Sequence, residues 1–273
     1  MISNPKTVLA RLLASTLLLT LLVACNLEKE ISINLPEYEQ KYLVECYLEA
    51  GKPYKLFLGK TVSYFDPPSL PLVQGAKVKI TIGNKTEILN YEVLADTAQR
   101  KIYNYTSKSL VPKDYTNEFK LEIVTKEGEL ISSACRLLRP VPIDSIGWKF
   151  RDSLAYILVQ FPDAPAQKNY YRIVMNENNV RKTGVRDFSV DDRLFDGKMF
   201  TTATRYDFKK NDTIKNKVYH IDKAWYDFLE STEDARRANG NPFAQPAAVT
   251  TNIKGGVGIF TGVSYSQKTV IIK

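Results

Sequence analysis

The chain has 273 residues, and its 38 lysines and arginines outweigh 30 acidic residues to give a formal net charge of +8. This length suits two domains of ordinary size. The basic residues are scattered, so they indicate solvated surfaces rather than a groove for nucleic acid. The single histidine, His220, cannot form a histidine-pair metal site, and neither Cys-x-x-Cys nor His-Glu-x-x-His occurs. We therefore expect no metal, no cofactor and no nucleic-acid partner.

The beginning of the chain has the features of an exported lipoprotein. Lys6 and Arg11 form a short basic region, and a mainly apolar run over 12–24 follows it and ends at Leu-Val-Ala-Cys25. This order is typical of a secretory signal peptide, and the apolar run is too short to span a bilayer. The last four residues resemble a lipobox, in which the cysteine is acylated and becomes the mature N-terminus. We predict a signal peptide over 1–24 with lipidation of Cys25; the alternative is a plain signal peptide with an incidental cysteine.

Residues 25–30 then form a short lipid-anchored tether. Its acidic residues, Glu28 and Glu30, resemble a surface-export signal of lipoproteins in one phylum of Gram-negative bacteria, although Lys29 lies between them. The alternative is a polar tether without a sorting role.

Residues 31–139 predict an N-terminal β-sandwich domain. Apolar and polar residues alternate along 42–48, 77–82 and 119–123, and glycine-containing turns separate such runs. Period-two patterning with turns at short spacing is typical of an antiparallel sandwich. Cys46 and Cys135 lie in two of these segments. In an oxidising compartment they could form a disulfide, or they could remain two buried thiols.

Residues 140–273 predict a C-terminal β-sandwich domain that is also antiparallel and immunoglobulin/fibronectin-like. The boundary is the proline-rich connector Arg-Pro-Val-Pro over 139–142. One helix is expected near 222–238, because Asp222 is a suitable N-cap and Trp225, Phe228 and Leu229 recur at helical spacing. We therefore expect a mainly β protein with a single helix in its second domain.

Signals for catalysis are sparse, and we expect that the chain is not an enzyme. No Gly-x-Ser-x-Gly elbow occurs, and His220 lies in a strand-like run. The only acidic cluster is Asp191-Asp192 with Asp196. Such oxygens could hold calcium or serve glycoside hydrolysis, but the alternating aspartates of a calcium loop are missing. We interpret the cluster as a solvated turn before a strand.

The glycine-rich segment over 255–262 is not a phosphate-binding loop, because no Lys-Ser or Lys-Thr follows the glycines and no helix pattern begins there. Glycine within a strand indicates a bulge or the close approach of another backbone. We predict a late strand with Val257, Ile259 and Val263 facing inward. The alternative is a binding loop formed with the candidate contact residues Asn241, Pro242, Phe243 and Asn252.

Several separated segments of the chain match one known family pattern. They are Leu-Pro-Glu-Tyr at 35–38, Leu-Val-Glu at 43–45, Tyr-Phe at 64–65, Gly-Ala-Lys-Val at 75–78, Pro-Val-Pro-Ile-Asp-Ser-Ile at 140–146, Asn-Tyr-Tyr-Arg at 169–172, Phe-Asp-Gly at 195–197, Asn-Pro-Phe at 241–243 and Asn-Ile-Lys-Gly-Gly-Val-Gly-Ile-Phe at 252–260. With the lipobox, they resemble the lipoprotein family catalogued as domain of unknown function 4249. A departure is Cys46-Tyr47, where the family pattern has glycine and an aromatic residue.

The resemblance implies an outer-membrane lipoprotein of Gram-negative bacteria, in a family often encoded near TonB-dependent transporters. It brings no catalytic residues. We expect a surface-exposed, lipid-anchored protein that acts as an accessory or ligand-binding component of a TonB-dependent nutrient-uptake system. Its expected partners are the membrane, through the anchor, the transporter, and a glycan or peptide ligand. The alternative is a structural or adhesive cell-surface lipoprotein.

Overall fold

A computed structural model of the chain describes residues 38–63, 66–67, 69–97, 100–177, 186–239 and 248–273, together with Leu9. The signal peptide, Cys25 and the tether lie outside the described residues. Contacts divide the chain between Glu39 and Gln40, and the unit from Gln40 to Lys273 holds all the strands and the helix considered below. No helix in the described part of the chain is both long and apolar enough to cross a membrane.

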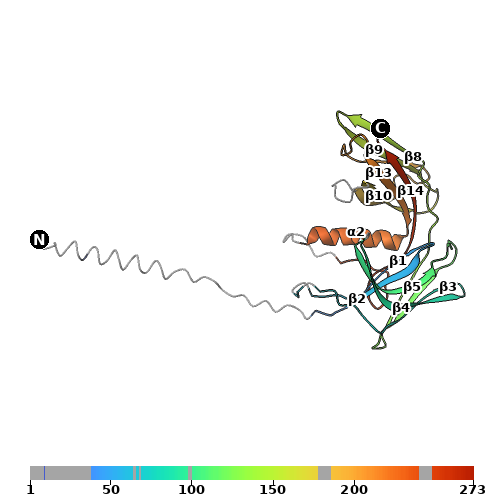
Figure 1. Cartoon of the computed structure of the whole chain (residues 1–273), viewed down its shortest axis with the longest axis vertical. Helices are drawn as coiled ribbons and strands as arrows, with labels where there is room; N and C mark the ends of the chain where they lie inside the picture. Colours follow the sequence, from blue (N-terminus) through green and yellow to red (C-terminus); the bar gives the residue numbers. More distant parts are fainter. Residues whose placement is uncertain are drawn as a thin grey trace. The chain divides into compact units, whose positions relative to one another are not determined.

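This unit is mainly β, as expected, with one helix (Figure 1). The elements are β1 (Tyr42–Glu49), β2 (Pro53–Lys60), β3 (Lys77–Ile82), β4 (Lys85–Asp96), β5 (Lys101–Leu110), β6 (Phe119–Val124), β7 (Leu130–Cys135), β8 (Ser145–Arg151), β9 (Leu154–Pro162), β10 (Tyr170–Glu177), β11 (Arg186–Asp191), β12 (Met199–Ala203), β13 (Thr213–Ile221), α2 (Lys223–Ala238) and β14 (Val257–Ile271). An 11-stranded sheet has the order β11-β10-β13-β14-β1-β2-β5-β4-β3-β6-β7, and a 3-stranded sheet has the order β12-β9-β8.

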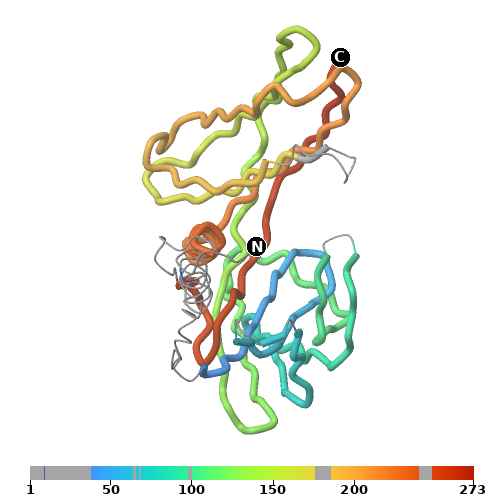
Figure 2. Tube along the Cα trace, turned by 90° about the vertical axis from the view of Figure 1, so that its left-hand side faces the viewer, coloured from blue at the N-terminus to red at the C-terminus, as the bar shows by residue number. Residues whose placement is uncertain are grey.

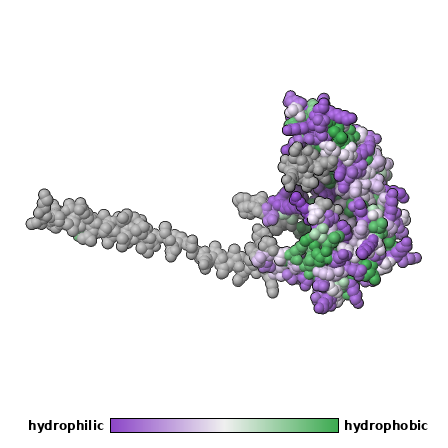
Figure 3. All heavy atoms as spheres, viewed as in Figure 1, coloured by the Kyte–Doolittle hydropathy of each residue, from purple (hydrophilic) through white to green (hydrophobic). Residues whose placement is uncertain are grey.

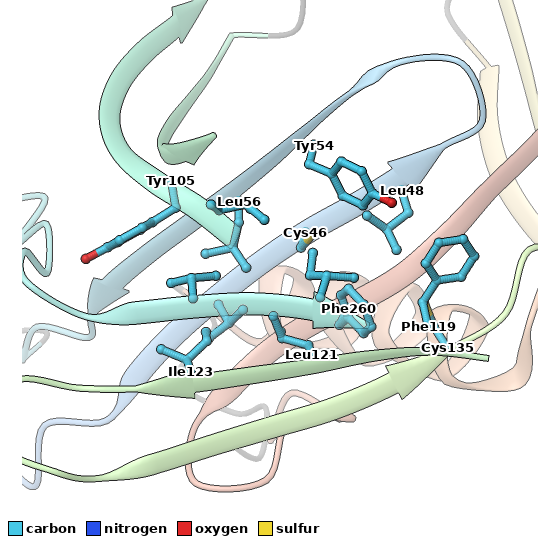
Figure 4. Close-up of a cluster of buried hydrophobic side chains, with 14 of the residues drawn as sticks. Cys46, Leu48, Tyr54, Leu56, Tyr105, Phe119, Leu121, Ile123, Cys135 and Phe260 are labelled. Atoms are coloured by element: carbon cyan, nitrogen blue, oxygen red, sulfur yellow. The ribbon is translucent and has the colours of Figure 1, made fainter. Parts of the chain in front are cut away.

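A first core lies among β1 to β7 and the first half of β14. The alternation predicted from the sequence is present: Val44, Cys46 and Leu48 of β1 are fully buried, and the residues between them are only partly buried. Figure 4 shows side chains from these strands meeting in the core, with Phe260 of β14 among them. The strands are rich in β-branched and aromatic residues because these side chains pack together in one apolar interior.

Cys46 and Cys135 both lie in the first core and are free thiols (Figure 4). Burial raises the pKa of both thiols above the ordinary range. Neither is therefore a reactive thiolate at neutral pH, and both act as small apolar side chains.

A second core lies between the small sheet and the strands β10, β11, β13 and the second half of β14. Ile157, Val159 and Phe161 of β9 are fully buried there, against Tyr171 and Ile173 of β10. The 7% exposed side chain of Phe195, from the loop after β11, closes one end of this core. The two cores are joined by strand pairing rather than by a free linker.

The last strand corrects the expectation that all strand pairs are antiparallel. β14 pairs in parallel with β1, from Leu43 with Val257 to Glu49 with Val263, and its later residues pair antiparallel with β13. Figure 2 shows this strand, in red, running through both halves of the unit. Successive parts of β14 therefore pair with different strands, and β14 joins the strands of the first core to those of the second. Residues at 253 and 260, expected in the second domain, therefore belong to the first core.

The predicted helix is present as α2. Asp222 is its N-cap, and its carboxylate accepts a hydrogen bond from the Trp225 backbone N–H at 2.8 Å. Trp225 is 2% exposed and packs with Ile221 and Ile259 in a third apolar cluster between the helix and the sheet. The aromatic stripe of the helix is therefore packed against this protein's own sheet.

We expect Asp222→Ala to lower the free energy of unfolding by about 1 kcal/mol, because it leaves a helix N–H without its capping acceptor. Asp222→Asn keeps an acceptor oxygen and should retain most of the stability. Asp227→Ala is the matched control: it removes only a surface ion pair with Lys223, which contributes little. Urea denaturation followed by circular dichroism measures the free energy of unfolding of the three variants. Equal decreases in Asp222→Ala and Asp227→Ala would contradict the capping role.

Candidate functional site

Two loops bring three carboxylates together at one end of the second core. Asp163 directly follows β9, and Asp192 and Asp196 follow β11. Carboxylate oxygens of the three lie within 4.8 Å of one another. Asp163 is 7% exposed and Asp192 is 4% exposed, whereas Asp196 lies at the surface. The solvated turn expected from the sequence is therefore wrong for Asp192, whose side chain folds inward.

Hydrogen bonds account for the burial of these charges. Asp163 Oδ1 accepts from the Tyr171 hydroxyl at 2.5 Å and from Asn169 Nδ2 at 3.1 Å, and its Oδ2 accepts from the Gly197 N–H at 2.8 Å. Asp192 Oδ2 accepts from the Asn169 N–H at 2.6 Å. These bonds tie the segment after β9 to the loop after β11, which is how a buried carboxylate remains stable.

His220 completes this polar network from β13. Its Nδ1 donates to the Arg139 carbonyl at 2.8 Å, its Nε2 lies 3.3 Å from Asn169 Oδ1, and its ring stacks on Tyr171. Burial lowers its pKa from the ordinary value of 6.5, although the bond to Arg139 and the charge of Asp163 act in the opposite direction. His220 therefore lies between the connector that joins the two cores and the residues around the acidic cluster, and its burial disfavours the protonated ring.

This pKa shift predicts a pH dependence of stability. The folded state resists protonation of His220, so the unfolded state binds more protons as the pH falls. The contribution of His220 is fully present above its ordinary pKa of 6.5 and is lost as the pH falls toward the lowered folded pKa. Histidine titrates roughly between pH 5 and pH 7. Over this range we expect the free energy of unfolding to fall more steeply with decreasing pH in the native chain than in His220→Gln. Parallel slopes in urea titrations of the two proteins would contradict this.

The acidic cluster could in principle hold a hard divalent cation, because calcium and magnesium bind carboxylate oxygens. Calcium takes about six to eight oxygen ligands, and each carboxylate here already accepts a hydrogen bond from the protein. These hydrogen bonds form a network that holds the two loops in place. Sequence reasoning missed Asp163 and Asn169 because they are distant in sequence from the acidic turn.

The predicted binding loop is only partly within the described residues. Asn241, Pro242 and Phe243 lie outside them. Asn252 is described, and its side-chain amide bonds the backbone of β14: Nδ2 donates to the Phe260 carbonyl at 2.7 Å, and Oδ1 accepts from the Phe260 N–H at 3.0 Å. Its own carbonyl accepts from the Ser133 hydroxyl of β7 at 2.8 Å. Asn252 thus joins β7 to β14.

A different surface stands out on β4. Every residue over 90–95 is exposed, so both faces of the strand are open along this stretch. It includes Val93, which is 53% exposed, and Leu94, and the neighbouring Ile102 of β5 is exposed as well. Figure 3 shows apolar side chains gathered where β4 and β5 lie in Figure 1. We call Tyr91, Val93, Leu94 and Ile102 the β4 apolar patch.

The fold defines a mainly β protein with a large mixed sheet shared by two cores and a small second sheet. The chain belongs to the family described as domain of unknown function (DUF4249), whose model matches residues 28–269. This match confirms the resemblance to domain of unknown function 4249 that was noted in the sequence.

Other comparisons add little to this assignment. No curated protein matches the chain. A solved structure titled "Cytokine receptor complex - Crystal form 1A" is similar to it with 10% identity and a TM-score of 0.28, covering 84% of this chain and 95% of that one. At this TM-score the likeness supports no argument about function.

Proposed function

We propose that this chain is an outer-membrane lipoprotein, anchored through Cys25 and exposed at the cell surface, that serves as an accessory component of a TonB-dependent nutrient-uptake system. The lipobox-like sequence supports the anchor. The setting implied by the family resemblance supports a transporter as the partner. The observation that carries a binding role is the β4 apolar patch.

Exposed apolar side chains that cluster on one element are typical of protein interaction sites. The patch lies on a strand with both faces open, so a partner could enclose it from two sides. Full burial of a valine, leucine or isoleucine contributes about 1.5–3 kcal/mol. Because the three in the patch are roughly half exposed, each would contribute about half of that before the costs of association. The patch is therefore the proposed contact with the transporter.

The test is co-purification from detergent-solubilised outer membranes. The native protein should recover a TonB-dependent transporter, and the double substitution Val93→Lys with Leu94→Lys should abolish recovery, because two charges would have to be buried in the interface. Ile271→Lys is the matched control, since this residue is 51% exposed on β14, away from the patch. Circular dichroism should show that all three proteins remain folded.

Recovery of no transporter by the native protein would overturn this role. A thermal-shift screen with glycans and peptides tests the ligand-binding form of the proposal separately. Activity against glycan or peptide libraries that disappears in Asp192→Asn or Asp196→Asn would instead favour a carboxylate-based hydrolase.

A structural or adhesive cell-surface role is the second candidate, and β14 favours it. This strand of 15 residues passes through both cores, and a strand of that length spans about 50 Å. A continuous strand would make the unit a stiff spacer. Loss of adhesion with unchanged nutrient uptake in a deletion strain would support this alternative.

The proposal also includes the arrangement of the strands into two sandwich modules. The second core lies between four strands, β11-β10-β13-β14, and three strands, β12-β9-β8, a number and arrangement typical of immunoglobulin-like sandwiches. The strands around the first core would form the other sandwich module. Both would be binding or spacing modules rather than catalytic ones.

A further inference from the structure

Two free strand edges lie beside each other at the second core. β11 is the last strand of the 11-stranded sheet, and β12 is the last strand of the 3-stranded sheet. Within the described ranges, β11 pairs only with β10 and β12 pairs only with β9. On an edge strand, every second residue directs its N–H and C=O away from its neighbour, ready to pair with an added strand.

A hollow of about 490 Å³ lies between these edges, lined by Arg186, Asp187 and Phe188 of β11 and by Thr202 of β12. Its volume is in the range of binding pockets, which is about 300–1,000 Å³. Phe188 packs against the second core, so it gives the hollow an apolar floor. The hollow therefore combines apolar surface with unpaired backbone.

Arg186 supplies the charge of this hollow. Its Nη1 donates to the Ala203 carbonyl of β12, so the guanidinium extends across the opening. Arg172 pairs with Asp187 and Arg193 pairs with Asp191, whereas Arg186 has no ion pair with any side chain that the structure describes, a set that leaves out those of 176–185. A guanidinium has five N–H donors and binds carboxylates in a bidentate manner. The positive charge of Arg186 therefore favours an acidic group.

We propose that this edge binds an extended acidic segment of a protein partner, which pairs with β11 as an added strand. Side chains of a strand alternate between its faces, so the face that includes Arg186 also includes Phe188 and Val190. A complementary segment therefore has an acidic residue opposite Arg186 and apolar residues two positions away. This inference is independent of the proposed transporter contact, because it concerns β11 and not the β4 apolar patch.

The probe is the peptide acetyl-TVTETVT-amide with a fluorescent label, whose central glutamate has valine two positions away in either direction. Fluorescence anisotropy is measured with the full-length protein in detergent. We expect binding that is about tenfold tighter than that of the matched peptide acetyl-TVTKTVT-amide, because a charge-assisted hydrogen bond is lost and like charges meet. Arg186→Gln should remove the difference between the two peptides, and Arg186→Lys should restore part of it.

Two controls separate strand pairing from simple charge attraction. Arg237→Gln, on the exposed end of α2, should leave both affinities unchanged. Successive backbone amides of an extended peptide point to opposite edges, and only one edge pairs with β11. N-methylation of the amides on the pairing edge should therefore abolish binding, and N-methylation of the amides on the other edge should not. No binding of the acidic peptide, equal binding of the lysine peptide or equal tolerance of both methylation patterns would overturn the proposal. Full competition by free benzoate would overturn it as well, in favour of a small-carboxylate pocket.

Discussion

Gly258→Ala should lower the free energy of unfolding by about 3 kcal/mol or more, because two costs add at this position. The residue has a φ of +117°, which side chains other than glycine rarely adopt. An added Cβ would also lie 2.0 Å from the Val44 carbonyl oxygen of β1, in the parallel pair. One of the two strands would have to move, and Val44 is fully buried in the first core.

The measurement is thermal unfolding, in which we expect the melting temperature to fall by about 10 °C, given about 2–4 °C per kcal/mol in a chain of this size. Gly147→Ala is the matched control, because Gly147 also lies in a strand, has no unusual φ, and has open space where the Cβ would be. Unchanged stability of Gly258→Ala with lost binding of a partner would instead favour the binding-loop interpretation of this segment.

Cys25→Ser should release the protein from the membrane. The serine cannot carry the thioether-linked lipid, and no helix in the described residues could take over attachment. Each buried CH₂ of an acyl chain contributes about 0.8 kcal/mol, so two or three chains hold far more firmly than one. We expect the variant to lose palmitate labelling and to appear either as a soluble folded protein or as the uncleaved precursor.

Thr16→Ser is the control, since it conserves a hydroxyl within the apolar run and should be processed and labelled normally. Membrane fractionation with an alkaline wash distinguishes anchored from adsorbed protein. If Cys25→Ser matures normally and remains in the washed outer membrane, the lipoprotein assignment is wrong.

Features with local causes were predictable from the sequence. Helix α2 begins after Asp222, because a carboxylate at that position caps its own first turn. The alternation in β1 indicated which residues face the core, because side chains along a strand point to opposite faces. The glycines over 255–262 indicated close backbone approach, and Gly256 and Gly262 lie where a Cβ would contact the carbonyl oxygens of Tyr42 and Arg136 at 2.8 and 2.5 Å.

The candidate sites were less predictable. The acidic turn was noticed, but its burial depends on Asp163 and Asn169, which no local pattern connects to Asp192. Asn252 was singled out as a ligand contact, yet it bonds the backbone of Phe260. The β4 apolar patch contains apolar residues of the kind found in buried strands, and only the structure shows that residues 90–95 are exposed.

The sequence by itself therefore determined the mainly β class, the position of the single helix, the faces of the principal strands, the family and the expectation of a lipid anchor. The helix, the strand faces and the anchor each depend on residues within a few positions of one another, and the class and the family depend on many such local patterns along the chain. Only the tertiary structure decided that β14 pairs in parallel with β1 and joins the two cores, and that β11 and β12 leave their edges open beside Arg186. Contacts across such distances, such as the hydrogen bond from the Tyr265 hydroxyl to the Glu49 carboxylate, 216 positions away, are selected by the packing of the whole chain. The alternation within a strand shows which face is buried but does not show which strand lies beside it.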